Sequence, residues 1–180
     1  MAPDDLEETS VLTALHFLTH IGQSWLVANL VPGSRKDRWL VILAGVALDL
    51  DGAGILWNDS AYRALHRAAG HGALAALVLI GLAVLAADRP LRTGALAALS
   101  FHLHLLLDVV GTGGLPIRYW WPASDRGLTY DGHWRLASWQ NALVMAFTAL
   151  AVLTIALRSR RSRRHTLQPP PPPAYRVGRG

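Results

Sequence analysis

Five long apolar blocks constrain this chain more than any other feature of its sequence. They comprise residues 11–31, 39–48 with a continuation to 57, 72–87, 93–110 and 139–157. Each block is nearly continuous, whereas the helices and strands of soluble proteins space their apolar residues at regular intervals. Several blocks approach the roughly 20 residues that a helix needs to cross a bilayer. The pattern predicts an all-α fold, a polytopic membrane bundle of about four to five helices.

The composition agrees with a membrane protein. Hydrophobic residues make up 52% of the 180 residues and charged residues 16%, whereas a soluble domain carries about 25% charged residues. The absence of cysteine excludes disulfides and thiolate metal ligands. The N-terminal stretch MAPDDLEETS is acidic and lacks the basic region of a secretory signal peptide. The first apolar block is therefore expected to remain in the protein as a helix.

The charge distribution divides the chain into three parts. We expect an acidic N-terminal segment at 1–10, a transmembrane helical domain at 11–157 and an Arg- and Pro-rich tail at 158–180. Seven of the 17 basic residues lie in the tail, which leaves ten against 12 acidic residues elsewhere. The tail has no apolar pattern with which to build a core, so it is expected to be disordered. Arginines beside a membrane helix favour contact with anionic lipids over nucleic-acid binding.

The basic residues predict an orientation in the membrane. They recur in alternate connections: Arg35, Lys36 and Arg38 after the first block, Arg89 and Arg92 after the third, and the arginine tail after the fifth. If the helices alternate in direction, these segments share one side, which the positive-inside rule places in the cytoplasm. The N-terminus and the Trp- and Tyr-rich connections at 51–70 and 111–138 would then lie outside.

Histidines and aspartates interrupt the apolar blocks at compatible depths. A helical rise of 1.5 Å per residue puts one set about 15 Å from the basic ends of three blocks, namely His20, Asp49 and His104. A second set lies slightly further out, namely His16, Asp51, His71 and Asp108. Such residues are costly inside a membrane and usually face one another or a polar cavity. Their levels predict a shared site.

Residue spacing supports the same grouping. His16 and His20 are four residues apart, as are His104 and Asp108, so each pair shares one face of a helix. His102 is two residues from His104 and is expected to point away from the site.

The DLD segment at 49–51 and the HRAAGH segment at 66–71 can add further carboxylates and imidazoles to the predicted site. Asp49 and Asp51 stand at a helix end that glycines interrupt, where both can turn inward. His66 and His71 are five apart, which an unbroken helix would separate by about 140°, but Gly70 offers a break that lets both converge.

These residues together predict a metal site with only imidazole and carboxylate ligands. The expected ligands are His16, His20, Asp49, Asp51, His66, His71, His104 and Asp108. Such ligands suit zinc first, with manganese, iron or magnesium as alternatives. Their number exceeds one tetrahedral site, so the centre could hold two ions.

Other interpretations remain open at this stage. A lone histidine in a membrane helix commonly forms a hydrogen bond between helices. A transporter could line a proton pathway with the same residues, although the sequence shows no convincing internal repeat. A haem-b protein could use His20 and His104 as its paired ligands. That interpretation leaves Asp49, Asp51 and Asp108 without a role.

Four short motifs follow one another in order on the expected helices. They are TH at 19–20, DLD at 49–51, HRAAGH at 66–71 and HLLLD at 104–108, followed by GTGG and by WWP at 120–122. This order resembles the YdjM family of bacterial inner-membrane metal-dependent hydrolases. The resemblance covers about residues 13–157. It implies a multi-pass protein of the inner membrane with hydrolase activity.

Metal-assisted hydrolysis is a reaction that the predicted residues allow. The expected ligands of the first metal are His20, Asp49, His104 and Asp108. Asp51, His66 and His71 are expected to complete a second metal or to act as acid and base. Arg67 and Arg118 could hold an anionic substrate group near the outer mouth, although Arg67 could equally anchor the chain at the interface. A site that opens toward the outer leaflet favours a phosphorylated or lipid-linked substrate. The sequence does not indicate the oligomeric state.

Overall fold

The described part of the chain forms five α-helices and one 3-10 helix. The computed structural model describes residues 3–56, 58, 60 and 66–166. The elements, in order, are α1 (Pro3–Ala28), α2 (Arg35–Val46), η1 (Ala47–Leu56), α4 (Ala73–Ala86), α5 (Pro90–Gly111) and α6 (Trp139–Thr166). The described residues contain no β-strand, and a lone antiparallel bridge joins Ile117 to Leu128 in the connection between α5 and α6. The prediction of an all-α fold with about four to five helices is confirmed.

Both terminal helices extend beyond the predicted apolar blocks. α1 begins at Pro3, so most of the predicted acidic segment belongs to the first helix. α6 continues to Thr166 and includes the first arginines of the predicted tail, which are good helix formers. The proline run lies outside the described residues.

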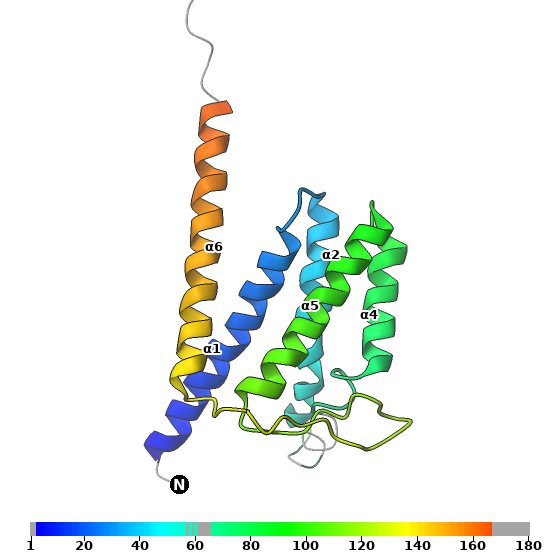
Figure 1. Ribbon diagram of the computed structural model, residues 1–180, viewed down its shortest axis with the longest axis vertical. Helices are drawn as coiled ribbons and strands as arrows, with labels where there is room; N and C mark the ends of the chain where they lie inside the picture. Colours follow the sequence, from blue (N-terminus) through cyan, green and yellow to red (C-terminus); the bar gives the residue numbers. More distant parts are fainter. Residues whose placement is uncertain (1–2, 57, 59, 61–65, 167–180) are drawn as a thin grey trace, which may run out of the picture.

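The helices alternate in direction, which places the basic connections at one end of the bundle. Figure 1 shows the α1–α2 and α4–α5 connections at the top, the end toward which the C-terminal part of α6 also extends. We call this end the basic end, and the opposite end, with η1 and the start of α4, the site end.

Capping interactions define the basic end. Ser34 caps α2 by accepting a hydrogen bond from the backbone N–H of Asp37 at 3.1 Å. Asp37 is buried and accepts the backbone N–H of Asp88 at 2.8 Å. Lys36 also pairs with Asp88 at 2.7 Å, and Pro90 occupies the first turn of α5, where its missing N–H costs nothing. These contacts join the start of α2 to the α4–α5 connection.

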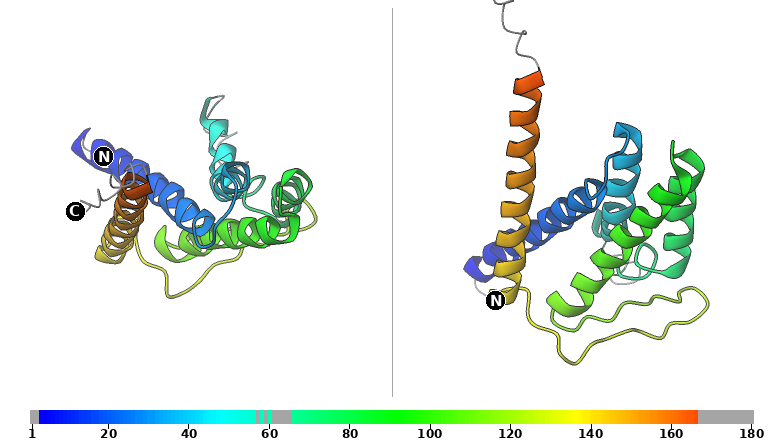
Figure 2. Two further views of the ribbon diagram at one scale, coloured as in Figure 1. Left: turned by 90° about the horizontal axis from the view of Figure 1, so that it is seen from above. Right: turned by 45° about the horizontal axis from the view of Figure 1, so that its top comes forward.

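α5 is the central helix of the bundle. It packs against α1, α2 and α4, whereas α6 packs mainly against α1. Figure 2 shows α6 beside α1 at the edge of the bundle. The core between α4, α5 and η1 is built around Phe101 and Leu48, both fully buried. The position of α5 allows its polar face to reach three other segments.

Two helices are long and apolar enough to cross a membrane. They are α5 and the part of α6 from Trp139 to Ser159. α5 is half-buried among its neighbours, and buried helices of soluble proteins pass the same test. α6 differs, because Leu143, Phe147 and Leu150 expose most of their apolar surface. Length and apolar composition make these two helices the candidate membrane spans of the described residues.

Small residues allow α2 to approach α1 and α5 closely. At Gly45 an added Cβ would overlap the hydroxyl oxygens of Ser24 on α1 and Ser100 on α5. Both serines are buried. The three helices therefore meet at a position that accommodates only glycine on α2.

We expect the Gly45→Ala variant to be less stable by about 1–3 kcal/mol, because an extra methyl group in a tight interface forces the helices apart. The matched control is Gly81→Ala on α4, where an added Cβ meets no atom within 4 Å. Thermal unfolding of the purified variants in detergent measures the difference. Equal changes in Tm for the two variants would show that the contact at Gly45 is not tight.

Candidate metal centre

The structure brings the predicted histidines and aspartates into one cluster. They come from four segments: His16 and His20 from α1, Asp49 and Asp51 from η1, His66 and His71 from the stretch before α4, and His104 and Asp108 from α5. His20, His71, His104 and Asp108 are almost fully buried, with at most 3% of each residue exposed. The cluster lies toward the site end.

Asp108 lies at the middle of the cluster. Its Oδ1 is 3.3 Å from Nε2 of His16 and 3.2 Å from Nε2 of His20. Its Oδ2 is 3.3 Å from Nε2 of His71 and 3.8 Å from Nε2 of His104. One carboxylate therefore faces two pairs of histidines, one pair with each oxygen.

Asp49 adds a carboxylate to the second pair. Its Oδ1 is 3.4 Å from Nε2 of His104 and 3.9 Å from Nε2 of His71. The result is two groups of three residues, and within each group the possible ligand atoms lie within 4.8 Å of one another. The groups are His16, His20 and Asp108, and Asp49, His71 and His104.

The two groups do not follow the two levels that the sequence predicts. The helix-depth estimate separates His20 from Asp108, yet these residues are in contact. It also separates His71 from Asp49 and His104, which form one group. The estimate assumes straight, level helices, whereas α1 crosses the bundle obliquely (Figure 1) and η1 has the longer rise of a 3-10 helix.

Two histidines have their ring orientation fixed by a partner on Nδ1. Nδ1 of His104 donates to the carbonyl oxygen of Gly45 at 2.8 Å, and Nδ1 of His71 donates to Oδ2 of Asp51 at 2.8 Å. A carbonyl or carboxylate oxygen only accepts, so the proton is on Nδ1 and Nε2 can present its lone pair to the cluster. Metal-binding histidines are commonly held in this way.

Atoms without hydrogen-bond partners show that the cluster fits a cation. Among the described residues, Nε2 of His20 and Nε2 of His104 are buried and have no hydrogen-bond partner. The same holds for Oδ2 of Asp49. Each of these ring nitrogens has a carboxylate oxygen within 3.4 Å. Four ligands about 2.1 Å from zinc in tetrahedral geometry are about 3.4 Å apart. The observed separations therefore match the spacing of ligands around one ion.

Asp51 holds the segment before α4 and does not face the centre of the cluster. Its Oδ1 contacts Nδ1 of His66 at 3.1 Å. Its Oδ2 accepts hydrogen bonds from His71 and from the backbone N–H groups of Arg67 and Gly70, at 3.0 and 3.1 Å. Both oxygens are occupied, so the geometry gives Asp51 the task of orienting the two histidines.

Gly70 makes this arrangement possible. An added Cβ there would overlap the carbonyl oxygen of Leu48 and come within 3.1 Å of Asp51 Oδ2. The break that the sequence places at Gly70 lets His66 and His71 contact the same carboxylate.

Asp51 and His71 shift each other's pKa. Burial alone would raise the pKa of the Asp51 carboxyl, but hydrogen bonds from His66 and His71 outweigh burial and hold the pKa at about 2. Burial alone would lower the pKa of His71, but hydrogen bonds to Asp108 and Asp51 raise this pKa to about 9. Asp51 and Asp108 thus surround the His71 ring with negative charge.

Arg67 reaches the cluster from a strained backbone position. Its φ of 62° lies in the left-handed region, which is uncommon for a residue with a side chain. The guanidinium is buried, lies 3.6 Å from Oδ2 of Asp108, and donates to the carbonyl oxygen of Leu115 at 3.3 Å. Backbone strain of this kind concentrates at functional sites.

Two other predicted residues lie apart from the cluster. The guanidinium of Arg118 is 3.9 Å from Asp125 and does not line the cavity beside the cluster. His102 is exposed and contacts the carbonyl oxygen of Ala98 and the hydroxyl of Tyr119. His102 therefore points away, as its spacing from His104 predicts.

A cavity of about 590 Å³ opens beside the cluster. The polar part of its wall includes His16, His20, Asp49, His66, Arg67 and Asp108. Its apolar part includes Phe17, Leu115 and Leu136. The volume lies within the usual range for a small-molecule site, roughly 300–1,000 Å³.

Sequence reasoning missed Gly45, Leu115 and Leu136. Gly45 is four residues before Asp49, and this spacing could have indicated that both lie on the side of the helix that faces the site. The two leucines lie in the connection between α5 and α6, which has no periodicity to indicate where they fold.

The ring geometry is incompatible with haem bound between His20 and His104. Their rings stack with centroids 3.8 Å apart and an interplanar angle of 16°. Paired haem ligands must approach the iron from opposite faces, which stacked rings cannot do.

Comparisons with protein-family models, with curated proteins and with solved structures find no match. What the cluster can do chemically is therefore inferred from its own residues.

We expect His104→Ala and Asp108→Ala to lose bound metal, because each removes a group that faces the centre of the cluster. The matched control is His102→Ala, two residues from His104 on the same helix. Elemental analysis of detergent-purified protein gives the metal content of each variant. Equal metal content in all three variants would contradict a metal centre at this cluster.

Proposed function

We propose that the protein is an integral membrane metal-dependent hydrolase with a two-metal centre that cleaves a phosphoester. The carrying observation is the Asp108 carboxylate, which faces one pair of histidine Nε2 atoms with each of its oxygens. A carboxylate in this position can bridge two ions. Two-metal sites with ions about 3.5–4 Å apart are typical of enzymes that hydrolyse phosphate esters.

The ligand set supports zinc first, with manganese, iron or magnesium as alternatives. His16, His20 and Asp108 would hold one ion, and Asp49, His71 and His104 the other, with Asp108 shared. Histidine-rich sites with carboxylates and no thiolate favour zinc and other transition metals over magnesium. The first ion would have three protein ligands, which would leave a position for water or substrate, as in catalytic zinc sites.

The surrounding residues can assist hydrolysis. When bound, divalent ions would lower the pKa of a water molecule and polarise a phosphoryl oxygen. In the reaction the water oxygen bonds to phosphorus, the ester P–O bond breaks, and the leaving oxygen takes up a proton. Arg67 lines the cavity and can neutralise a phosphoryl oxygen. His66 also lines the cavity and, held by Asp51, can supply the proton.

The proposed setting is a bacterial inner membrane, with the N-terminus outside and the C-terminus in the cytoplasm. Two membrane-length apolar helices and the exposed apolar residues of α6 support a membrane. The shared end of the basic connections supports the orientation (Figure 1). The order of motifs that resembles the YdjM family leads us to propose this setting and the hydrolase class. In this orientation the site end faces the outer leaflet.

Hydrolysis can be tested with purified protein loaded with zinc or manganese and a chromogenic phosphodiester or phosphomonoester. We expect measurable turnover that is lost on chelation. Asp51→Asn should weaken metal binding about 10- to 100-fold, the usual effect of removing a group that orients a ligand. Absence of turnover of both ester types by the metal-loaded protein would overturn the proposal.

A second pair of variants separates substrate binding from metal binding. Arg67→Ala should lower kcat/KM while leaving the metal content unchanged, because Arg67 faces the cavity without serving as a ligand. Arg126→Ala is the matched control, since Arg126 is exposed on the connection between α5 and α6. Similar kinetics for the two variants would remove Arg67 from the proposed site.

The orientation predicts the behaviour of reporter fusions. A reporter attached after Arg164 should be active only as a cytoplasmic protein, and one inserted near Asp125 only as an external one. The opposite pattern would place the mouth of the site in the cytoplasm.

A further inference from the structure

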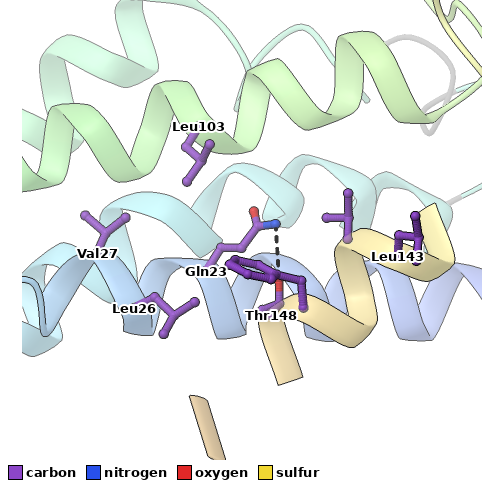
Figure 3. A pocket seen from close by; sticks show the side chains of 8 residues that line it. Gln23, Leu26, Val27, Leu103, Leu143 and Thr148 are labelled. Atoms are coloured by element: carbon purple, nitrogen blue, oxygen red, sulfur yellow. Dashed lines mark hydrogen bonds between the residues drawn. The ribbon is translucent and has the colours of Figure 1, made fainter. Parts of the chain in front are cut away.

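A second cavity, of about 440 Å³, lies between α1, α5 and α6. Figure 3 shows its principal side chains: Gln23, Leu26 and Val27 from α1, Leu103 from α5, and Leu143 and Thr148 from α6. The wall is almost entirely apolar. We call this cavity the α1–α5–α6 groove.

Four of the α1 residues that line the two cavities follow one stripe of the helix. His16 and His20 line the metal cavity, and Gln23 and Val27 line the groove. These positions are spaced by four, three and four residues, which defines one stripe along a helix. Val27 lies about 10 Å further along the axis than His20 at 1.5 Å per residue. The apolar groove therefore follows the metal cavity along α1.

Gln23 stands where the charged wall gives way to the apolar wall. Its amide nitrogen donates to the hydroxyl of Thr148 at 3.5 Å, the contact drawn as a dashed line in Figure 3. Its amide oxygen is buried and has no hydrogen-bond partner in the described part of the chain. A buried acceptor usually has a partner. A bound molecule with a hydroxyl or N–H group at this point would supply one.

The size of the groove favours a flexible chain over a helix. Two turns of an α-helix about 10 Å wide fill roughly 850 Å³, about twice the volume of the groove. A hydrocarbon chain is much thinner and fits within this volume. The apolar wall suits a hydrocarbon, and Arg67 with the metal-binding residues suits a negatively charged head.

We propose that the substrate is a lipid-like phosphoester whose hydrocarbon chain lies in the α1–α5–α6 groove while its phosphate reaches the metal centre. This inference rests on the proposed hydrolase function and specifies its substrate class. Lipid tails are already in an apolar medium, so moving one into the groove gains little hydrophobic energy. The groove instead positions the ester bond at the metal centre.

A photoreactive long-chain alkyl phosphate, with a diazirine at the end of its chain, tests occupation of the groove directly. With the full-length, metal-loaded protein in detergent, we expect cross-links to concentrate at residues 23–27 and 143–148. Excess unlabelled alkyl phosphate should suppress them. Labelling spread evenly over the outward leucines of α6, such as Leu150 and Leu153, would indicate only surface lipid and would overturn the inference.

Chain length provides the kinetic test. Leu103→Trp and, independently, Val144→Trp should fill the groove, whereas Leu106→Trp places the same side chain on the exposed face of α5. For each groove variant we expect the ratio of kcat/KM for a long-chain phosphoester to that for a short-chain one to fall about tenfold. The ratio should remain unchanged in the Leu106 variant. Turnover of the short ester shows that a variant is folded.

The outcomes separate the two proposals. If the wild-type protein hydrolyses both esters and the groove variants leave the ratio unchanged, the groove assignment fails and the hydrolase proposal stands. If neither ester is hydrolysed, the hydrolase proposal fails, and cross-linking alone decides whether an alkyl chain occupies the groove.

Discussion

The structure depends on the buried carboxylate of Asp108. A charge removed from water is costly unless it is paired and hydrogen-bonded, and Asp108 is 3% exposed. Four histidines and Arg67 surround it: His104 is on α5 itself, and the others come from α1 and from the stretch before α4. A bound cation would strengthen this attraction, so the groups that would hold the metal also hold the bundle together. The loss of one partner would leave the remaining charges without compensation in a poorly solvated interior.

Support for the centre comes from the backbone as much as from side chains. Gly45 brings α2 close enough for its carbonyl oxygen to orient His104, and the same glycine permits the contact between α1, α2 and α5. Gly70 permits the backbone to turn around Asp51, which orients His71. Both histidines of the second group, His71 and His104, thus have a tautomer fixed by a partner outside the group. A change in the spacing between α2 and α5 would therefore also change the orientation of the His104 ring.

The sequence was most informative where helical periodicity applies. Pairs four residues apart on α1 and α5 indicated which residues share a face, and the exposed position of His102 followed from the same rule. The position of each residue along the bundle axis was harder to predict. A tilted helix advances less along that axis per residue, and a 3-10 segment rises more per residue than an α-helix. The role of Asp51 could not be predicted, since hydrogen bonds from backbone N–H groups depend on how a nonhelical segment folds. Leu115 and Leu136 reach the cavity from a connection that carries no periodic signal.

The position of the centre explains how one site could serve a substrate with two different ends. Buried polar groups of irregular backbone need hydrogen-bond partners within the protein. Here the nonhelical stretch before α4 donates the N–H groups of Arg67 and Gly70 to Asp51, so the break in helical structure also builds the site. The cavity at this break offers charge to a phosphate. Further along α1, the helices leave the apolar α1–α5–α6 groove, in which we propose that the hydrocarbon chain lies.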